Sequence, residues 1–145
     1  MIKSIFLADD DADDRFFFAE ALKDINEHTE LTTAKDGAEL MATLNEVVTA
    51  PPPPHVIFLD LNMPLKNGIE CLREIRETTK LKDIPVVIFS TSSNQGEVDT
   101  TFSLGANCYV RKPSSHLNLV ATIENVLALD FSSQIHQLPR DKFVL

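Results

Sequence analysis

The chain has 145 residues, of which 43% are hydrophobic and 24% are charged, and its formal net charge is −9. This composition is typical of a soluble globular domain, and the length is sufficient to bury one core. The negative charge argues against a nucleic-acid surface, because phosphate binding needs clustered Lys and Arg. No apolar run approaches the roughly 20 residues of a membrane span, and the N-terminus lacks the apolar region of a signal peptide. We therefore expect one cytoplasmic domain that binds neither nucleic acid nor membrane.

The cysteine and histidine content argues against a disulfide framework and against a histidine metal site. The chain holds two cysteines, Cys71 and Cys108, and four scattered histidines without ligand-like spacing. We interpret both cysteines as reduced, packed residues.

Five short apolar runs alternate with helical patterns along the chain. The predicted strands are Ile5–Ala8, Leu31–Ala34, His55–Asp60, Val86–Phe89 and Cys108–Val110. A helix is expected after each strand, beginning in turn near the acidic run 9–14 and at Ala38, Gly68, Asn94 and Ser114 or Ser115. The alternation favours an α/β fold, with a three-layer, doubly wound, five-stranded parallel sheet covered by helices on both faces. Physical rules alone leave the strand order open.

Helical spacing predicts which apolar residues face inward. They are Phe17, Leu22 and Ile25, then Leu40, Met41, Leu44 and Val48, then Ile69, Leu72 and Ile75, then Val98, Phe102 and Leu104, and finally Leu117, Leu119, Val120, Ile123, Val126 and Leu127. The run Pro51–Pro54 is typical of a stiff spacer. We interpret Asp11, Asp13 and Asp14 as solvated acids at a helix start, where they suit the helix dipole.

Polar side chains follow four of the predicted strands, at the point where each strand ends. They are Asp9 and Asp10 after the first strand, Asp60 at the end of the third, Ser90 and Thr91 after the fourth, and Lys112 after the fifth. Because the carboxyl ends of parallel strands open onto one edge of a sheet, we expect these groups to lie close together. Three carboxylates in a partly desolvated cleft repel one another, and a cation must offset that repulsion. Oxygen ligands of this kind suit Mg²⁺, and Lys112 supplies a second positive charge.

Asp60 has two interpretations on these grounds. An acid at the end of a strand is often a turn residue, and Pro64 and Gly68 break the chain shortly after it. With a metal ion bound, the same carboxylate can act as a nucleophile toward phosphorus and form an acyl phosphate. The metal, Lys112 and the Ser90 hydroxyl would then hold the phosphoryl oxygens.

Taken together, these segments resemble the receiver domains of bacterial two-component response regulators. The resemblance is carried by Phe6–Asp10, Leu59–Pro64 with Gly68, Ser90 and Tyr109–Pro113, and it covers about residues 3–129. It implies a flavodoxin-like fold with strand order 2-1-3-4-5. It also implies a receiver domain over residues 1–130, followed by a C-terminal tail, residues 131–145, that is too short to be an output domain.

The resemblance assigns a role to each matching residue. Asp60 would be the phosphoacceptor; Asp10, Asp60 and the Asn62 carbonyl would bind Mg²⁺, with Asp9 helping through water; Ser90 and Lys112 would contact the phosphoryl group; and Tyr109 would be an aromatic switch that turns inward on activation. Thr91 departs from the family pattern, which often has Ala or Gly at that position. Its bulk is expected to restrict access to Asp60.

The implied function is that of a single-domain response regulator. A sensor histidine kinase or a histidine phosphotransfer protein would donate the phosphoryl group. A conformational switch in the face formed by the fourth helix, fifth strand and fifth helix would then signal to a downstream protein target. The chain is expected to catalyse only its own phosphorylation and dephosphorylation, and otherwise not to be an enzyme.

Two further features concern subfamily and assembly. The run Ser90–Ser92 and the proline-rich loop resemble those of stand-alone receivers associated with phytochrome-type histidine kinases. The apolar residues of the tail, Phe143 among them, are expected to pack either on the domain or in a homodimer contact.

Two other functions fit an acid-lined α/β sheet less well. A phosphatase of the haloacid dehalogenase type needs a second acid two residues after its nucleophile, but Asn62 stands there, and an amide cannot serve as a general acid. A flavin-binding electron carrier needs a donor-rich loop around a phosphate after the first strand, whereas that loop is acidic here. Steady turnover of a phosphate ester would favour the first alternative, and a coloured protein the second.

Overall fold

Strands and helices alternate through the chain, and the computed structural model describes residues 2–47, 54–131 and 137–145. The strands are β1 (Lys3–Ala8), β2 (Thr29–Ala34), β3 (Val56–Leu59), β4 (Val86–Ser90) and β5 (Cys108–Arg111). The helices are α1 (Ala12–Lys23), α2 (Gly37–Val47), α3 (Gly68–Glu77), α4 (Gln95–Ser103) and α5 (His116–Leu127), followed by a 3₁₀ turn, η1 (Arg140–Lys142). The predictions for Val48 and Pro51–Pro53 lie outside the described residues. No described helix combines the length and apolar character needed to cross a membrane.

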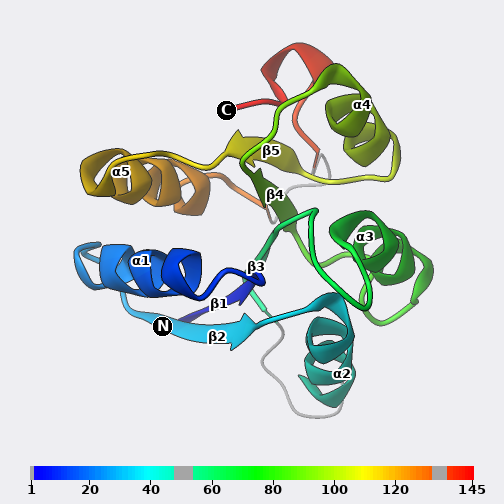
Figure 1. The fold of residues 1–145 in the computed structure, drawn as a ribbon, viewed down its shortest axis with the longest axis horizontal. Helices are drawn as coiled ribbons and strands as arrows, with labels where there is room; N and C mark the ends of the chain where they lie inside the picture. The colour runs from blue at the N-terminus through cyan, green and yellow to red at the C-terminus, as the bar shows by residue number, and fades with distance from the viewer. Residues whose placement is uncertain (1, 48–53, 132–136) are drawn as a thin grey trace.

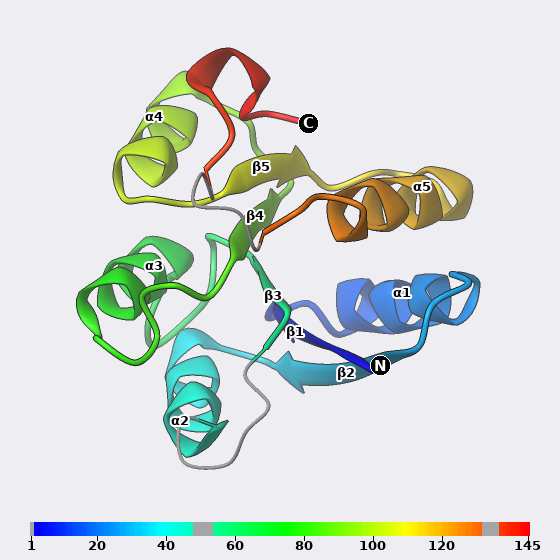
Figure 2. The same ribbon diagram turned by 180° about the vertical axis from the view of Figure 1, so that it is seen from behind.

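The five strands form one parallel sheet in the order β2-β1-β3-β4-β5. Helices α1 and α5 cover one face of the sheet, and α2, α3 and α4 cover the other (Figure 1 and, from behind, Figure 2). The predicted three-layer, doubly wound, flavodoxin-like fold is confirmed. Because β1 and β3 are neighbours at the centre, segments that are distant in the chain end side by side at one edge of the sheet.

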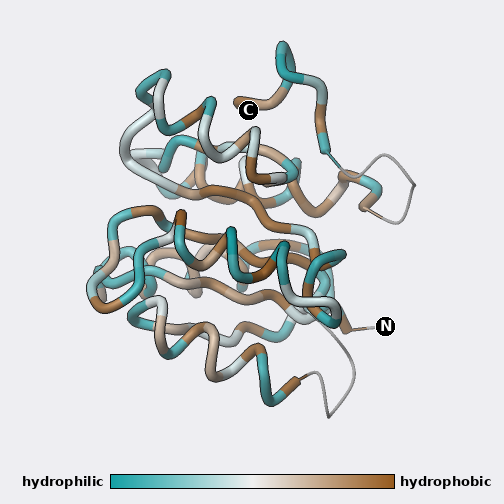
Figure 3. The backbone as a smooth tube through the Cα atoms, turned by 90° about the vertical axis from the view of Figure 1, so that its right-hand side faces the viewer, coloured by the Kyte–Doolittle hydropathy of each residue, from teal (hydrophilic) through white to brown (hydrophobic). Residues whose placement is uncertain are grey.

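The central strands are continuous apolar runs because helices cover them on both faces. Every residue of β3 and β4 is buried, and β5 is exposed only at Arg111. In Figure 3 hydrophobic stretches run through the middle of the molecule, between helices that carry hydrophilic residues. On α1, Phe18 packs edge to face against Phe58 and Phe89, with ring centroids 4.9 and 5.6 Å apart.

Two predicted inward residues face solvent instead. Phe17 is 53% exposed and Leu117 is 80% exposed. The buried residues of α1 are Phe18, Ala21 and Leu22, a spacing of three and four residues that turns Phe17 away from the sheet. In α5 the buried stripe starts at Leu119, and Leu117 lies two positions earlier, on the opposite side of the helix.

The two cysteines are free and buried. Burial raises the pKa of Cys71 and Cys108 to about 12, because a thiolate in either place would be desolvated. Both residues are therefore packed, as predicted, and the raised pKa keeps their thiols in the weakly nucleophilic protonated form.

The last stretch of the tail, residues 137–145, packs on α4 and β5 (Figure 1). Tyr109 N donates to Phe143 O at 2.9 Å, and Leu145 N donates to Tyr109 O at 2.8 Å, so the tail pairs with β5 through a parallel bridge. The Phe143 ring is fully buried against Phe102 and Tyr109. The tail thus covers part of the open edge of β5, where unpaired backbone groups would otherwise face solvent.

Candidate functional site

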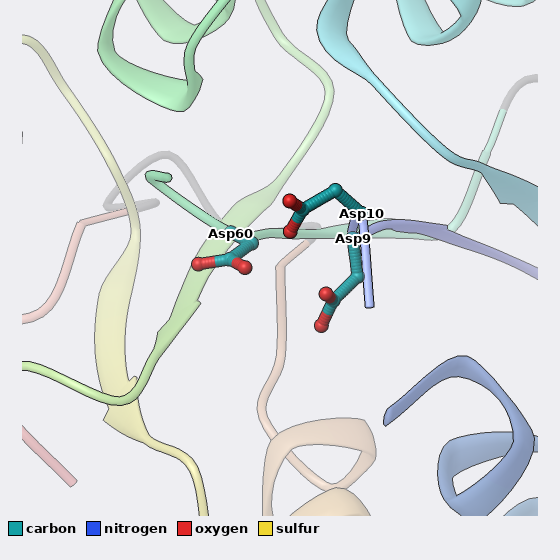
Figure 4. A group of neighbouring side chains, drawn as sticks. All are labelled: Asp9, Asp10 and Asp60. Atoms are coloured by element: carbon teal, nitrogen blue, oxygen red, sulfur yellow. The ribbon is translucent and has the colours of Figure 1, made fainter. Parts of the chain in front are cut away.

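Two central strands end in carboxylates that lie close together. Asp9 follows β1 and its N–H donates to Ala34 O at 3.0 Å, while Asp60 follows β3 and its N–H donates to Ala8 O at 3.0 Å. These bonds continue the ladder one residue past each strand and fix where the two side chains begin. Asp9, Asp10 and Asp60 each have one carboxylate oxygen within 4.8 Å of those of the other two. Figure 4 shows the Asp10 carboxylate directed toward Asp60.

Lys112 brings a positive charge to these acids from the end of β5. Its N–H donates to Ser90 O at 2.8 Å, and its side chain is only 9% exposed. The Nζ atom lies 2.7 Å from Asp9 Oδ2, 2.8 Å from Asp14 Oδ2 and 3.2 Å from Asp60 Oδ2. We call Asp9, Asp10, Asp14, Asp60 and Lys112 the acid cluster.

Burial shifts the protonation of the acid cluster. It raises the pKa of Asp60 to about 6, although the charge of Lys112 opposes the shift. Burial likewise raises the pKa of Asp9, again against Lys112. Burial would lower the pKa of Lys112, but its close contacts with the carboxylates of Asp14, Asp9 and Asp60 raise it overall, so the ammonium stays charged. Buried carboxylates whose charged forms are disfavoured in this way gain from any added cation.

The acid cluster fits a small divalent cation. Asp9 Oδ2 is buried without a hydrogen-bond partner among the described residues, and its contact with Lys112 has the distance of an ion pair but not the geometry of a hydrogen bond. An open cleft of about 500 Å³ adjoins the acid cluster at Asp10, and Asn62 is also among the residues that line this cleft. Carboxylate oxygens with room for water are the ligands that Mg²⁺ prefers.

Gly68 sets the shape of the loop that leads from β3 to α3. Its N–H donates to Leu61 O at 3.0 Å, and a Cβ at this position would lie 2.2 Å from Asp60 O. Only glycine lets the start of α3 approach the backbone of Asp60 so closely. In the same loop Leu65 has a φ of 67°, which is uncommon for a residue with a side chain.

The residues predicted as switch and phosphoryl contacts lie at the ends of β4 and β5. Ser90 is fully buried, and Thr91 is exposed in the loop that follows. Tyr109 is fully buried, and its hydroxyl donates to Ser92 O at 2.6 Å. Ser92 N in turn donates to Ser90 Oγ at 3.3 Å. Ser92 therefore links Tyr109 to the end of β4.

Asp14 belongs to the acid cluster, so its interpretation as a solvated helix-start acid is wrong. Its carboxylate accepts a hydrogen bond from Lys112 Nζ at 2.8 Å. Asp11 and Asp13 are exposed acids at the helix start, as predicted, and Asp11 also caps α1, because its side chain accepts from Asp14 N. The sequence held one signal for Asp14: α1 begins only two residues after Asp10, so its first turn stays within reach of the strand ends.

The fold and the acid cluster agree with a family match. The response regulator receiver domain model matches residues 5–124, and the chain belongs to that family. Among similar curated proteins, response regulator Rcp1 of Synechocystis sp. is 36% identical over 126 residues, which is 86% of each chain. A chemotaxis protein CheY homologue of Campylobacter jejuni is 32% identical over 102 residues, which is 69% of this chain and 74% of that one.

Solved structures show the same relationship. The phosphorylated cyanobacterial phytochrome response regulator RcpA superposes with a TM-score of 0.79 at 36% identity, covering 87% of this chain and 91% of that one. The Mn²⁺-bound form of response regulator Rcp1 gives a TM-score of 0.78 at 34% identity, covering 94% and 99%. The resemblance to receivers of phytochrome systems is confirmed.

Proposed function

We propose that this chain accepts a phosphoryl group on Asp60 and signals through a conformational switch. The observation that carries the proposal is the 3.2 Å contact between Asp60 Oδ2 and Lys112 Nζ, inside a cluster that also holds Asp9 and Asp10. Phosphoryl transfer depends mostly on positioning and charge neutralisation, and this arrangement supplies both. The similarity to phosphorylated RcpA supports the proposal.

In the proposed reaction, a carboxylate oxygen of Asp60 attacks phosphorus and forms an acyl phosphate. The bond from phosphorus to the donor nitrogen breaks, and the electron pair stays with the imidazole of a phosphohistidine, which takes up a proton as it leaves. The donor is a sensor histidine kinase or a histidine phosphotransfer protein. The Lys112 ammonium holds an oxygen of the transferred group, and the hydroxyl of Ser90, at the end of β4, is proposed to contact another.

Mg²⁺ is the proposed resident ion. Asp10, Asp60 and the Asn62 carbonyl would hold it, with Asp9 acting through water, and the ion would neutralise negative charge on the acids and on the phosphoryl oxygens when bound. The hard oxygen donors of the acid cluster and the Mn²⁺-bound form of Rcp1 support a divalent site. Because the Asn62 amide cannot transfer protons, we propose no turnover of phosphate esters beyond the chain's own phosphorylation and dephosphorylation.

Tyr109 is the proposed route from Asp60 to a protein target. Its hydroxyl reaches Ser92, two residues after the end of β4, and its backbone pairs with the tail. We propose that phosphorylation shifts the population of two states of the face formed by α4, β5 and α5. Hydrogen exchange over residues 90–129 should change when Mg²⁺ and beryllofluoride, a phosphoryl mimic, are added. Unchanged exchange there would argue against the switch.

We also propose that Thr91, which is exposed in the loop after β4, restricts access to Asp60.

The acceptor role has a direct test. Incubation with acetyl phosphate and Mg²⁺, followed by intact-protein mass spectrometry, should show one added phosphoryl group. Asp60→Asn should abolish the adduct. Asp83→Asn is the matched control, because Asp83 is exposed in the loop before β4, at the opposite end of the sheet. An adduct that survives Asp60→Asn, or none in the wild type, would overturn the proposal.

A further inference from the structure

Asp14 is a fourth carboxylate at the site, and the proposed reaction does not use it. Its side chain is 34% exposed, whereas those of Asp9 and Asp60, with which it shares Lys112, are 0% and 7% exposed. Its hydrogen bond to Lys112 Nζ is 2.8 Å long, and that of Asp60 is 3.2 Å. Helix α1 therefore holds the ammonium from the exposed side of the acid cluster.

The ammonium of Lys112 has three N–H donors and three carboxylates around it. A phosphoryl group on Asp60 adds negative charge and strong acceptor oxygens, and it needs the same donors. An N–H of Lys112 that donates to Asp14 is therefore not available to donate to a phosphoryl oxygen. Conversely, a lysine held toward α1 leaves more of the Asp9 and Asp60 oxygens to a cation.

We propose that Asp14 is a positioning residue for Lys112, holding its ammonium at the edge of the acid cluster in competition with the phosphoryl group. This inference deepens the proposed function and rests on it. Asp14 weakens binding of a phosphoryl group at Asp60 and strengthens binding of a divalent cation. The two effects have opposite signs, whereas structural damage to α1 would weaken the binding of both ligands.

The experiment compares Asp14→Asn, which removes the charge at nearly constant size, with the wild type. Isothermal titration calorimetry measures the affinity of each protein for Mg²⁺ alone, and then its affinity for beryllofluoride at saturating Mg²⁺. We expect beryllofluoride to bind about fivefold more tightly and Mg²⁺ about threefold more weakly, which is the size expected for a partly exposed charged contact. Asp14→Glu keeps the charge and should stay within about twofold of the wild type for both.

Asp13→Asn is the matched control, because it makes the same change of charge in the same helical turn at an exposed residue. It should change either affinity by less than about 1.5-fold. Weaker binding of both probes in Asp14→Asn, no change in either, or equal effects in Asp13→Asn would overturn the inference alone. A wild type that binds no beryllofluoride and accepts no phosphoryl group overturns the proposed function, and this inference with it.

Discussion

The side chain of Lys112 reaches from the end of β5 past β4 to Asp60 at the end of β3, where Nζ lies 3.2 Å from Oδ2. The ammonium also lies 5.7 Å from the centroid of the Phe89 ring on β4. The contact joins strand ends that are 52 residues apart in the chain, and it offsets the repulsion between Asp60 and Asp9. The stability of the fold and the chemistry of the site therefore depend on the same ammonium.

Lys112→Met should destabilise the metal-free protein by about 3 kcal/mol, because it leaves buried carboxylates without a counter-charge. Urea unfolding at neutral pH measures the loss, and Mg²⁺ should recover part of it by binding the same acids. Lys80→Met, at an exposed residue in the loop after α3, is the control and should change the free energy of unfolding by less than about 0.5 kcal/mol. Equal effects of the two variants would contradict the prediction.

The pKa of Asp60 predicts how stability depends on pH. The folded chain holds this proton up to about pH 6, whereas the ordinary value is 3.8. Between these values the folded state binds more protons than the unfolded state, so the contribution of Asp60 to the free energy of unfolding falls as pH rises. Above pH 7, ionisation of Asp60 in the folded state has lowered the free energy of unfolding by about 3 kcal/mol in total.

Asp60→Asn should therefore be more stable than the wild type at pH 7.5 without Mg²⁺, and the difference should shrink toward pH 4. Urea unfolding of both proteins across this range measures it. The pKa of Asp9 is also raised by burial. The free energy of unfolding of Asp60→Asn should therefore still decrease somewhat as pH rises. A difference that is independent of pH, or that grows toward pH 4, would show that Asp60 is not held in its protonated form.

The strands and the main site residues could be predicted because each depends on a short stretch of chain. A strand buried on both faces is simply an apolar run, and the acids Asp9 and Asp60 mark where two such runs end. Helical faces were harder to predict. Phe16, Phe17 and Phe18 are adjacent, and packing against β3 and β4 selects Phe18.

The contact of Asp14 with Lys112 was missed, and the position of the tail was left open between two alternatives, because the partners of both are distant in the chain. Asp14 and Lys112 are 98 residues apart, and an acid in the first turn of a helix has an adequate local explanation in the helix dipole. The tail shows no periodicity. Besides the Phe143 ring and the backbone bonds to Tyr109, it is held by side-chain bonds from Gln137 to α4 and the loop after it and by the ion pair of Arg140 with Asp99.

Gly68→Ala should disturb the site through the backbone. The added methyl group would lie 2.2 Å from Asp60 O, so the loop after β3 must move, and we expect a loss of about 3 kcal/mol in stability with weaker Mg²⁺ binding. Gly96→Ala, in the first turn of α4, is the control, because the atom nearest to the added Cβ would be Asn94 Oδ1 at 3.5 Å. It should be neutral or stabilise by about 0.5 kcal/mol. Similar urea midpoints for the two variants would argue against the close approach at Gly68.

Phe143→Ala should release the tail from β5. The ring is fully buried against Phe102 and Tyr109, so its removal should cost about 3 kcal/mol in urea unfolding and speed hydrogen exchange of the Tyr109 amide. Val144→Ala, at a residue that is 42% exposed, should cost about 0.5 kcal/mol. Unchanged protection of the Tyr109 amide in Phe143→Ala would show that the ring does not hold the tail in place.

The central claim, that Asp60 accepts the phosphoryl group, is tested most directly by chemical trapping. After treatment with acetyl phosphate and Mg²⁺, borohydride reduces an aspartyl phosphate to homoserine, and peptide mass spectrometry locates the modified residue. We predict homoserine at position 60, formed only when Mg²⁺ is present. Homoserine at position 9, 10 or 14 with Asp60 intact would contradict it.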